Sequence, residues 1–228
     1  MLSGYADIAN LATQVMANEL TPEYLDRLSQ AIASAHSLFD VLSRDVERHV
    51  TRTTVDDMEL AVAAESDPLT EIQQSRRDYV RACFAFVEAL CFSMKLLSQQ
   101  SLNELQLEDK LLCKEQDFDI DGRGKVAIKK RKISFLSNLR YSFDVFCRSF
   151  GIANTCDYAD NGFRELQNSV AVRDRLMHPK ETQDLFITSG ELLSMANGFT
   201  WFASQHRAIV YAGLNSVTTQ FESSAERK

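Results

Sequence analysis

Glycine and proline are scarce in this chain, which has 8 Gly and 3 Pro among 228 residues and no glycine between Gly4 and Gly122. β-Sandwiches and barrels connect their strands through many tight turns, and those turns depend on these two residue types. The scarcity therefore argues against an all-β fold and makes helices the expected structure. The composition, 45% hydrophobic and 25% charged, is that of an ordinary globular protein.

A long uninterrupted hydrophobic run is also missing. The longest apolar stretch, residues 82–97, contains Glu88, Ser93 and Lys95 and is shorter than the roughly 20 residues needed to cross a bilayer. We therefore expect a buried helix there and no membrane among the partners. No Lys or Arg precedes Arg27, so the basic start of a signal peptide and the arginines of an organelle transit peptide are both absent.

Paired cysteines and metal-ligand spacings are missing as well. The five cysteines form an odd set without CxxC spacing, which favours reduced thiols and a cytoplasmic location. The four histidines, at positions 36, 49, 178 and 206, are scattered and form no HExxH motif. Glycine-rich phosphate loops and GxSxG elbows do not occur either. We expect no metal site and no cofactor.

Helix signals are present throughout the chain. Thr21-Pro22 predicts the start of a helix over 22–50, along which an apolar seam recurs at spacings of three and four; its members are Leu25, Leu28, Ile32, Ala35, Phe39, Leu42 and Val46. Residues 51–65 fit a short helix or a bent continuation. Asp67-Pro68 repeats the start signal and opens what we expect to be the most deeply buried helix, in which the lone carboxylate of Glu88 must find a partner or face solvent.

Further signals predict the rest of the architecture. Four more helices are expected: one opened by a Ser101-x-x-Glu104 capping box and running to about 115, one over 133–150 ended by Gly151, one over 161–178 ended by Pro179, and one over 190–219 opened by Thr188-x-x-Glu191. The predicted fold is thus all-α, a bundle of long antiparallel helices with a small β-hairpin inserted near 117–131. One domain covers 1–228, with a short helical extension over 1–20 and a polar tail over 222–228.

The predicted hairpin has an acidic arm and a basic arm. Carboxylates at 117, 119 and 121 before Gly122 match the first half of a calcium loop, but Ile128 stands where the loop needs a bidentate Glu. We expect no calcium and instead cross-strand charge pairs. The formal net charge of −7 excludes a generally basic nucleic-acid coat, so contact with RNA would need a local patch. Such a patch is offered by Lys129, Lys130, Arg131 and Lys132, unless this run is only a solvated loop.

The segment 173–179 combines unusual residue types at a helix end. Phe163, Leu166 and Val170 form an apolar stripe whose next positions are Arg173 and Met177, so a guanidinium falls on the face expected to be buried and needs an anionic partner.

His178 lies four residues after Asp174, and Pro179 ends the helix there. An always-charged donor beside a group that titrates near neutrality suits acid-base chemistry on a phosphodiester. A helix C-cap, with His near the negative end of the dipole, explains the same residues without chemistry.

The segment resembles the signature of the HEPN superfamily, in which an Arg is followed after four to six residues by a His near a helix end. The family usually has Asn after the Arg, where this chain has Asp174. The helical layout is similar over most of residues 20–220, with the signature on the penultimate helix.

The resemblance implies a metal-independent endoribonuclease, used in many members for toxin or antiphage defence and usually working as a homodimer. The ribose 2′-hydroxyl would attack the adjacent phosphorus and leave a 2′,3′-cyclic phosphate. His178 would move the proton, Arg173 would hold the negative charge on the phosphoryl oxygens, and Asp174 would orient His178. Arg175 and Lys180 would bind backbone phosphates, with the basic arm of the hairpin extending that track, and an antitoxin or regulatory protein is a further expected partner.

Two other interpretations stay open. The chain fits a non-catalytic HEPN-like module that binds a partner protein or nucleotide, because superfamilies often keep a fold and lose its chemistry. It also fits a helical scaffold outside the superfamily, in which Arg173 and His178 are incidental. A homodimer is expected in addition from the apolar seam of residues 25–46, which needs a partner helix.

Overall fold

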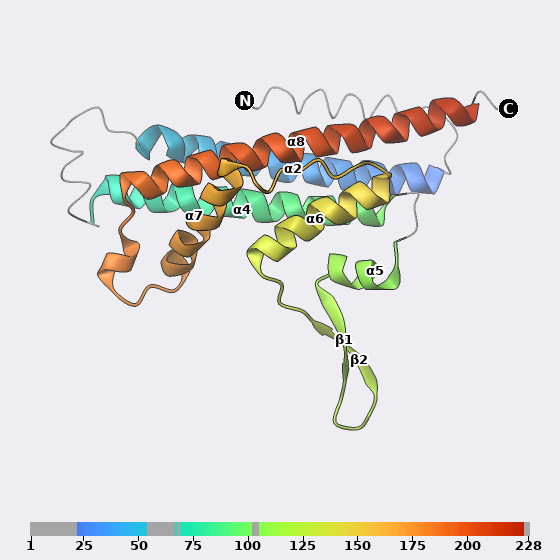
Figure 1. Cartoon of the computed structure of the whole chain (residues 1–228), viewed down its shortest axis with the longest axis horizontal. Helices are drawn as coiled ribbons and strands as arrows, with labels where there is room; N and C mark the ends of the chain where they lie inside the picture. Colours follow the sequence, from blue (N-terminus) through green and yellow to red (C-terminus); the bar gives the residue numbers. More distant parts are fainter. Residues whose placement is uncertain (1–21, 54–66, 68, 102–104, 226–228) are drawn as a thin grey trace. The chain divides into compact units, whose positions relative to one another are not determined.

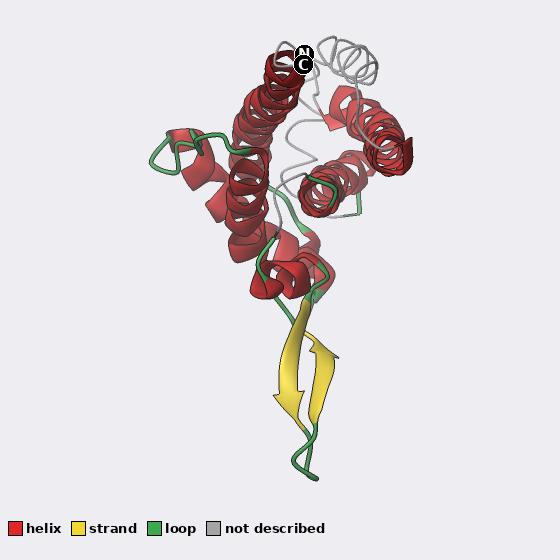
Figure 2. Cartoon of the chain, turned by 90° about the vertical axis from the view of Figure 1, so that its right-hand side faces the viewer, coloured by secondary structure: helices red, strands yellow, loops and turns green. Residues whose placement is uncertain are grey.

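The computed structural model of the chain describes residues 22–53, 67, 69–101 and 105–225. This part contains six α-helices, one 3-10 helix and a two-stranded antiparallel sheet (Figures 1 and 2). The prediction of an all-α fold with a small hairpin insertion is confirmed. The chain divides into two compact units, a first one of residues 1–36, 90–156 and 206–228 and a second one of residues 37–89 and 157–205. In the described residues no helix is long and apolar enough to cross a bilayer.

Most predicted elements are present within a few residues of their expected bounds. In chain order they are α2 (Pro22–Thr53), α4 (Glu71–Gln99), α5 (Leu107–Cys113), β1 (Gln116–Ile120), β2 (Val126–Lys130), α6 (Phe135–Phe150), α7 (Asn161–Met177), η1 (Thr182–Leu185) and α8 (Ser189–Ala225). The helix α8 continues past the predicted end at 219. The expected extension over 1–20, most of the segment 51–65 and the box ending at Glu104 lie outside the described residues.

The apolar seam of α2 is partly buried. Leu28, Phe39 and Val46 are each less than 8% exposed, as the spacing of three and four predicts. The ring of Phe39 meets Phe86 of α4 edge to face at 5.3 Å, within the second unit. Part of the seam is therefore occupied inside the chain, and contact of its half-buried members with a second copy stays a prediction.

In the first unit α6 packs closely against the C-terminal part of α8. A Cβ at Gly213 would lie 2.6 Å from the ring of Phe146, so only glycine allows this approach. The hydroxyl of Ser216 donates to the carbonyl of Phe150 at 3.0 Å. Helix α6 ends as predicted at Gly151, whose φ of 66° is left-handed and favours glycine.

The hairpin of the first unit is fixed at its base by a buried lysine. Lys95 of α4 is fully buried, and its Nζ lies 3.0 Å from Glu115 Oε1 and 2.9 Å from Asn138 Oδ1. The carbonyl of Glu115 accepts from the N–H of Arg131 at 2.7 Å, which closes the hairpin. The sequence shows Lys95 only as an interruption of an apolar run, whereas the structure makes it the anchor of the hairpin.

In the second unit α7 lies directly against α8. Helix α4 also contacts α8, because the rings of Phe86 and Phe199 meet edge to face at 5.2 Å. A Cβ at Gly198 would come within 2.6 Å of the backbone of Leu166. Because no larger residue fits at Gly198 without a shift of α7, this contact sets how the signature helix lies on its neighbour.

Candidate functional site

Helix α7 begins and ends on strong local signals. The side chain of Asp160 accepts a hydrogen bond from the N–H of Gly162 at 2.6 Å and caps the first turn. At the other end Pro179 has no N–H to continue the helix, and His178 leaves helical geometry with φ −135° and ψ 56°. The signature segment thus occupies the last turn of α7 and the residues just after it.

The buried face of α7 differs from the predicted stripe in its last turns. The buried residues are Phe163, Leu166, Ser169, Val172 and Leu176. Met177, predicted on the stripe, is 57% exposed. The predicted stripe continued from Leu166 to Val170, whereas the buried positions after Leu166 follow at spacings of three, three and four. Arg173 consequently lies at the border of the buried face, next to Val172, instead of in its middle.

Arg173 has the anionic partner that its position requires. Its Nη2 lies 2.9 Å from Oε1 of Glu88 on α4, and the guanidinium carbon is 5.4 Å from the centre of the Phe84 ring. The Arg173 side chain is 26% exposed and that of Glu88 is 47% exposed. The expected need for a partner is confirmed, and Glu88 both finds a partner and faces solvent. A cation held over a ring and beside a carboxylate is fixed in place yet open to solvent.

Asp174 and His178 are both exposed at the end of α7. The Asp174 carboxylate lies 3.9 Å from Arg173. The backbone N–H of His178 donates to the carbonyl of Asp174 at 3.1 Å, as a last helical hydrogen bond. In the described part of the chain no hydrogen bond joins the imidazole to another group. Orientation of His178 by the Asp174 carboxylate therefore stays a prediction.

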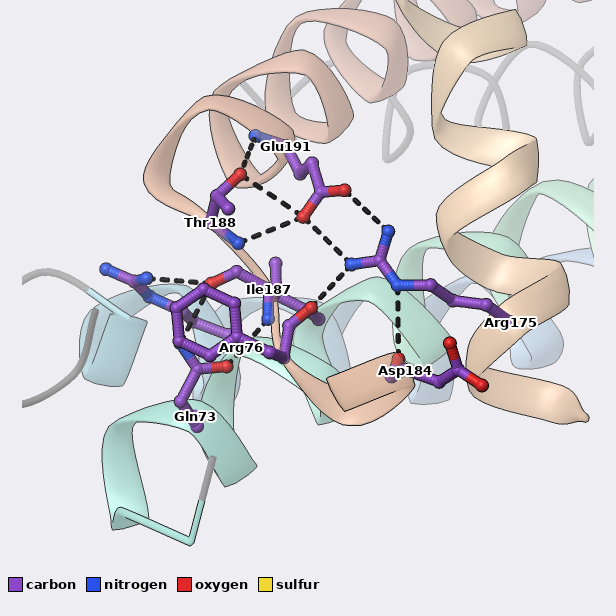
Figure 3. A network of polar contacts seen from close by, with 8 residues as sticks. Gln73, Arg76, Arg175, Asp184, Ile187, Thr188 and Glu191 are labelled. Carbon is purple, nitrogen blue, oxygen red and sulfur yellow. Dashed lines mark hydrogen bonds and ion pairs between the residues drawn. The ribbon is translucent and has the colours of Figure 1, made fainter. Parts of the chain in front are cut away.

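Arg175 is held by four hydrogen bonds, which Figure 3 shows. Its Nη1 and Nη2 contact the two carboxylate oxygens of Glu191 at 2.6 and 2.9 Å. Its Nε donates to the carbonyl of Asp184 at 3.1 Å, and Nη2 donates also to the carbonyl of Phe186. The guanidinium of Arg175 holds the pKa of the Glu191 carboxyl below its usual range.

A phosphate at Arg175 would compete with a bidentate carboxylate and two carbonyls. Arg175 therefore has a role in the fold of the second unit that the sequence did not indicate, and its contact with RNA stays a prediction. The segment between α7 and α8 depends on this side chain.

The same segment is held from the other side by the first turns of α4. Gln73 exchanges two hydrogen bonds of 2.8 Å with the backbone of Ile187. Arg76 donates to the Ile187 carbonyl at 2.9 Å (Figure 3). It also donates to the hydroxyl of Ser189 at 3.0 Å. Both side chains are buried. The sequence reasoning missed them, although the buried stripe of α4, continued towards its N-terminus at spacings of three and four, falls on both positions.

The other predicted phosphate contacts fall into two groups. Lys180 is exposed beside the signature segment in the second unit. The basic arm of the hairpin belongs to the first unit, where Lys129 pairs with Asp119 at 2.8 Å and Arg131 pairs with Asp117 at 3.0 Å. These two ion pairs confirm the predicted cross-strand charge pairing. Lys130 and Lys132 are exposed.

The described residues contain no group of three or more His, Cys, Asp or Glu side chains that could hold a metal ion. No family model, curated protein or solved structure matches the chain.

Proposed function

We propose that this chain is a metal-independent endoribonuclease of the HEPN type, with Arg173 and His178 as its reacting pair. The observation that carries the proposal is that Arg173 is held by neighbouring side chains while the His178 side chain is exposed to solvent. Arg173 is held in a partly exposed position by Glu88 and Phe84. His178, five residues later, presents an exposed imidazole at the end of α7.

The proposed reaction needs only these two groups at the scissile phosphate. The ribose 2′-oxygen forms a bond to phosphorus as the bond to the 5′-oxygen breaks, which leaves a 2′,3′-cyclic phosphate and a 5′-hydroxyl. His178 takes the proton of the 2′-hydroxyl or gives one to the leaving 5′-oxygen. Arg173 donates to the phosphoryl oxygens, on which negative charge builds in the transition state. Lys180 supports the neighbouring backbone phosphate.

The ion pair between Glu88 and Arg173 describes the proposed site before RNA binds. The Glu88 carboxylate neutralises Arg173 in the absence of RNA, so an incoming phosphate must share or replace that ion pair. Because the Glu88 side chain is 47% exposed, it can turn to water at small cost. The resemblance further supports a homodimer and a toxin or antiphage role in the cytoplasm, restrained by an antitoxin or regulatory protein. The homodimer rests on that resemblance.

A non-catalytic module is the second candidate, and one observation favours it. Arg173 is already neutralised by Glu88, and the Asp174 carboxylate makes no hydrogen bond to His178 in the described residues. Such a module would bind a partner protein or nucleotide through the same surface without breaking a bond.

Incubation of the purified chain with RNA in excess EDTA separates the two candidates. The ribonuclease cleaves with chelator present, because its charge stabiliser is an arginine, and leaves 2′,3′-cyclic phosphate ends that alkaline phosphatase does not remove. Arg173→Ala and His178→Ala variants serve as controls for a contaminating nuclease. Binding of RNA without cleavage, or cleavage that EDTA abolishes and magnesium restores, would reject the proposed mechanism.

A further inference from the structure

One face of the hairpin is apolar and uncovered. Phe118 pairs in register with Ile128, and Ile120 pairs with Val126, so these four side chains lie on the same face of the sheet. Their exposed fractions are 48%, 56%, 70% and 69% in that order. Figure 1 shows the two strands extending away from α5 of the same unit. A sheet face of this kind is normally covered by another layer, and we call it the apolar hairpin face.

The acidic residues of the hairpin are all engaged within it. Asp119 pairs with Lys129 and Asp117 with Arg131, on the side opposite the apolar hairpin face. In the turn, Oδ1 of Asp121 accepts from the backbone N–H groups of Arg123 and Lys125, both at 2.9 Å. Between residues 116 and 132 these three carboxylates stand against six Lys and Arg residues, so the hairpin carries a net positive charge.

Four cations of the hairpin have no ion-pair partner in the described part of the chain. Arg123 and Lys125 lie at the turn, and Lys130 and Lys132 lie at the base. The apolar hairpin face is thus bordered at both ends by positive charge, in a chain whose formal net charge is −7. This local positive charge is complementary to an anionic partner.

We propose that the apolar hairpin face docks on an anionic lipid surface, with its aliphatic side chains at the level of the acyl boundary and its terminal cations at the headgroups. Exposed apolar area combined with basic residues is what binds a peripheral protein to such a surface. The absence of a spanning helix, from which no membrane partner was expected, does not bear on a surface contact. The docking surface lies in the first unit and is independent of the proposed ribonuclease site.

Other occupants fit the observations less well. The four exposed side chains offer on the order of 400 Å², about half of what each partner contributes to a stable protein interface. A second copy of the hairpin would also bring four cations against four cations. RNA gains from stacking on aromatic rings, whereas three of these four side chains are aliphatic.

Flotation of the full chain with lipid vesicles tests the proposal. Vesicles of phosphatidylcholine with about 30% phosphatidylserine should carry the protein upward at low salt, and vesicles of phosphatidylcholine alone should carry much less. The double substitution Ile120→Thr and Val126→Thr keeps β-branched residues in the strands and should lower the vesicle partition coefficient at least about tenfold. Ala127→Thr, on the opposite face, is the matched control and should change it by less than about twofold.

Three results would overturn the proposal. One is no flotation on anionic vesicles at low salt. Another is flotation that the double substitution leaves unchanged, since charge alone would then explain it. The third is a double variant that keeps vesicle binding but loses another interaction. Loss of binding to a single-stranded RNA would assign the face to RNA, and loss of self-association in sedimentation would assign it to a second copy. Because both substituted side chains are exposed, the melting temperature should stay within a few degrees and a folding defect is excluded by that measurement.

Discussion

Two arginines of α7, two positions apart, have opposite surroundings. Arg173 and Arg175 are almost equally exposed, at 26% and 28% of their side chains. Arg175 is bound by a bidentate carboxylate and two backbone carbonyls, while Arg173 meets an exposed carboxylate and the face of a ring. Exposure therefore does not distinguish a structural arginine from a candidate for chemistry. The two cases are distinguished by the number of acceptors around the guanidinium and by how firmly those acceptors are held.

The acceptors of Arg175 are themselves fixed. Glu191 also accepts from the N–H and the hydroxyl of Thr188, at 3.0 and 3.2 Å, and so caps α8. The neighbouring Ile187 is held by two buried side chains of α4. None of these groups can turn away without opening the start of α8. Glu88, by contrast, can leave Arg173 by a side-chain rotation, and the comparison predicts different outcomes when each arginine or its partner is changed.

The largest expected effect is on catalysis, at His178. His178→Ala should lower cleavage by about 10²-fold to 10⁴-fold, the contribution of a positioned general acid or base. Its stability should fall by no more than about 1 kcal/mol, because only capping and dipole interactions at the helix end are lost. Single-turnover cleavage and urea denaturation measure the two effects. Unchanged cleavage with a much lower denaturation midpoint would identify His178 as a structural cap and favour the non-catalytic module.

Arg175→Met should have the largest effect on stability. It leaves a half-buried carboxylate and two carbonyls without their donor, and we expect a loss of about 2–3 kcal/mol in the free energy of unfolding. Arg173→Met is the matched control on the same helix and should cost less than about 1 kcal/mol, since Glu88 regains water. Equal losses for the two variants in urea denaturation would contradict the distinction between the two arginines.

A pH titration of stability should test the coupling between Arg175 and Glu191. Arg175 lowers the pKa of Glu191 below its ordinary value of 4.5. A carboxyl with a depressed pKa in the folded state adds stability that is fully present above the unfolded pKa and is lost as pH falls through the folded pKa. The wild-type chain should therefore lose more stability between pH 6 and acidic pH than Arg175→Met does. Urea midpoints over this range test it, and parallel curves for the two proteins would refute the coupling.

The sequence predicted the elements better than the polar contacts between them. Caps at Gly151, Pro179 and Thr188 are local signals, and the helices end or begin there as expected. The hairpin and its charge pairs follow from alternation within a few residues. The contacts of Gln73 with Ile187 join positions 114 residues apart, and no local pattern states which loop a buried polar side chain will reach.

The sequence named candidate residues at the end of α7 but indicated only part of their contacts. That Arg173 needs a carboxylate follows from its neighbours on the helix, but the choice of Glu88 depends on how α4 lies against α7. The contacts of Arg175 were not foreseen for the same reason, because its acceptors come from the loop and helix that follow α7. Polar residues on an apolar helix stripe thus mark positions whose partners come from distant parts of the sequence.

The smallest and most specific effect should come from Glu88. Glu88→Gln removes the negative charge that neutralises Arg173 and keeps a side chain of the same size. If phosphate competes with Glu88 for Arg173, the variant should bind RNA about two- to fivefold more tightly, the range of a partly exposed ion pair. The gain should appear as a lower KM with kcat little changed, because Glu88 leaves Arg173 before the chemical step.

Asp78→Asn provides the control for this charge change. Asp78 lies on the same helix and pairs with Arg81 at 3.3 Å, so the substitution alters the net charge equally without touching Arg173. Salt dependence of RNA binding should then steepen for Glu88→Gln alone, since one more cation becomes available to phosphate. A lower kcat in Glu88→Gln, with KM unchanged, would mean that the carboxylate positions Arg173 for the transition state, and Glu88 would then belong to the reacting set.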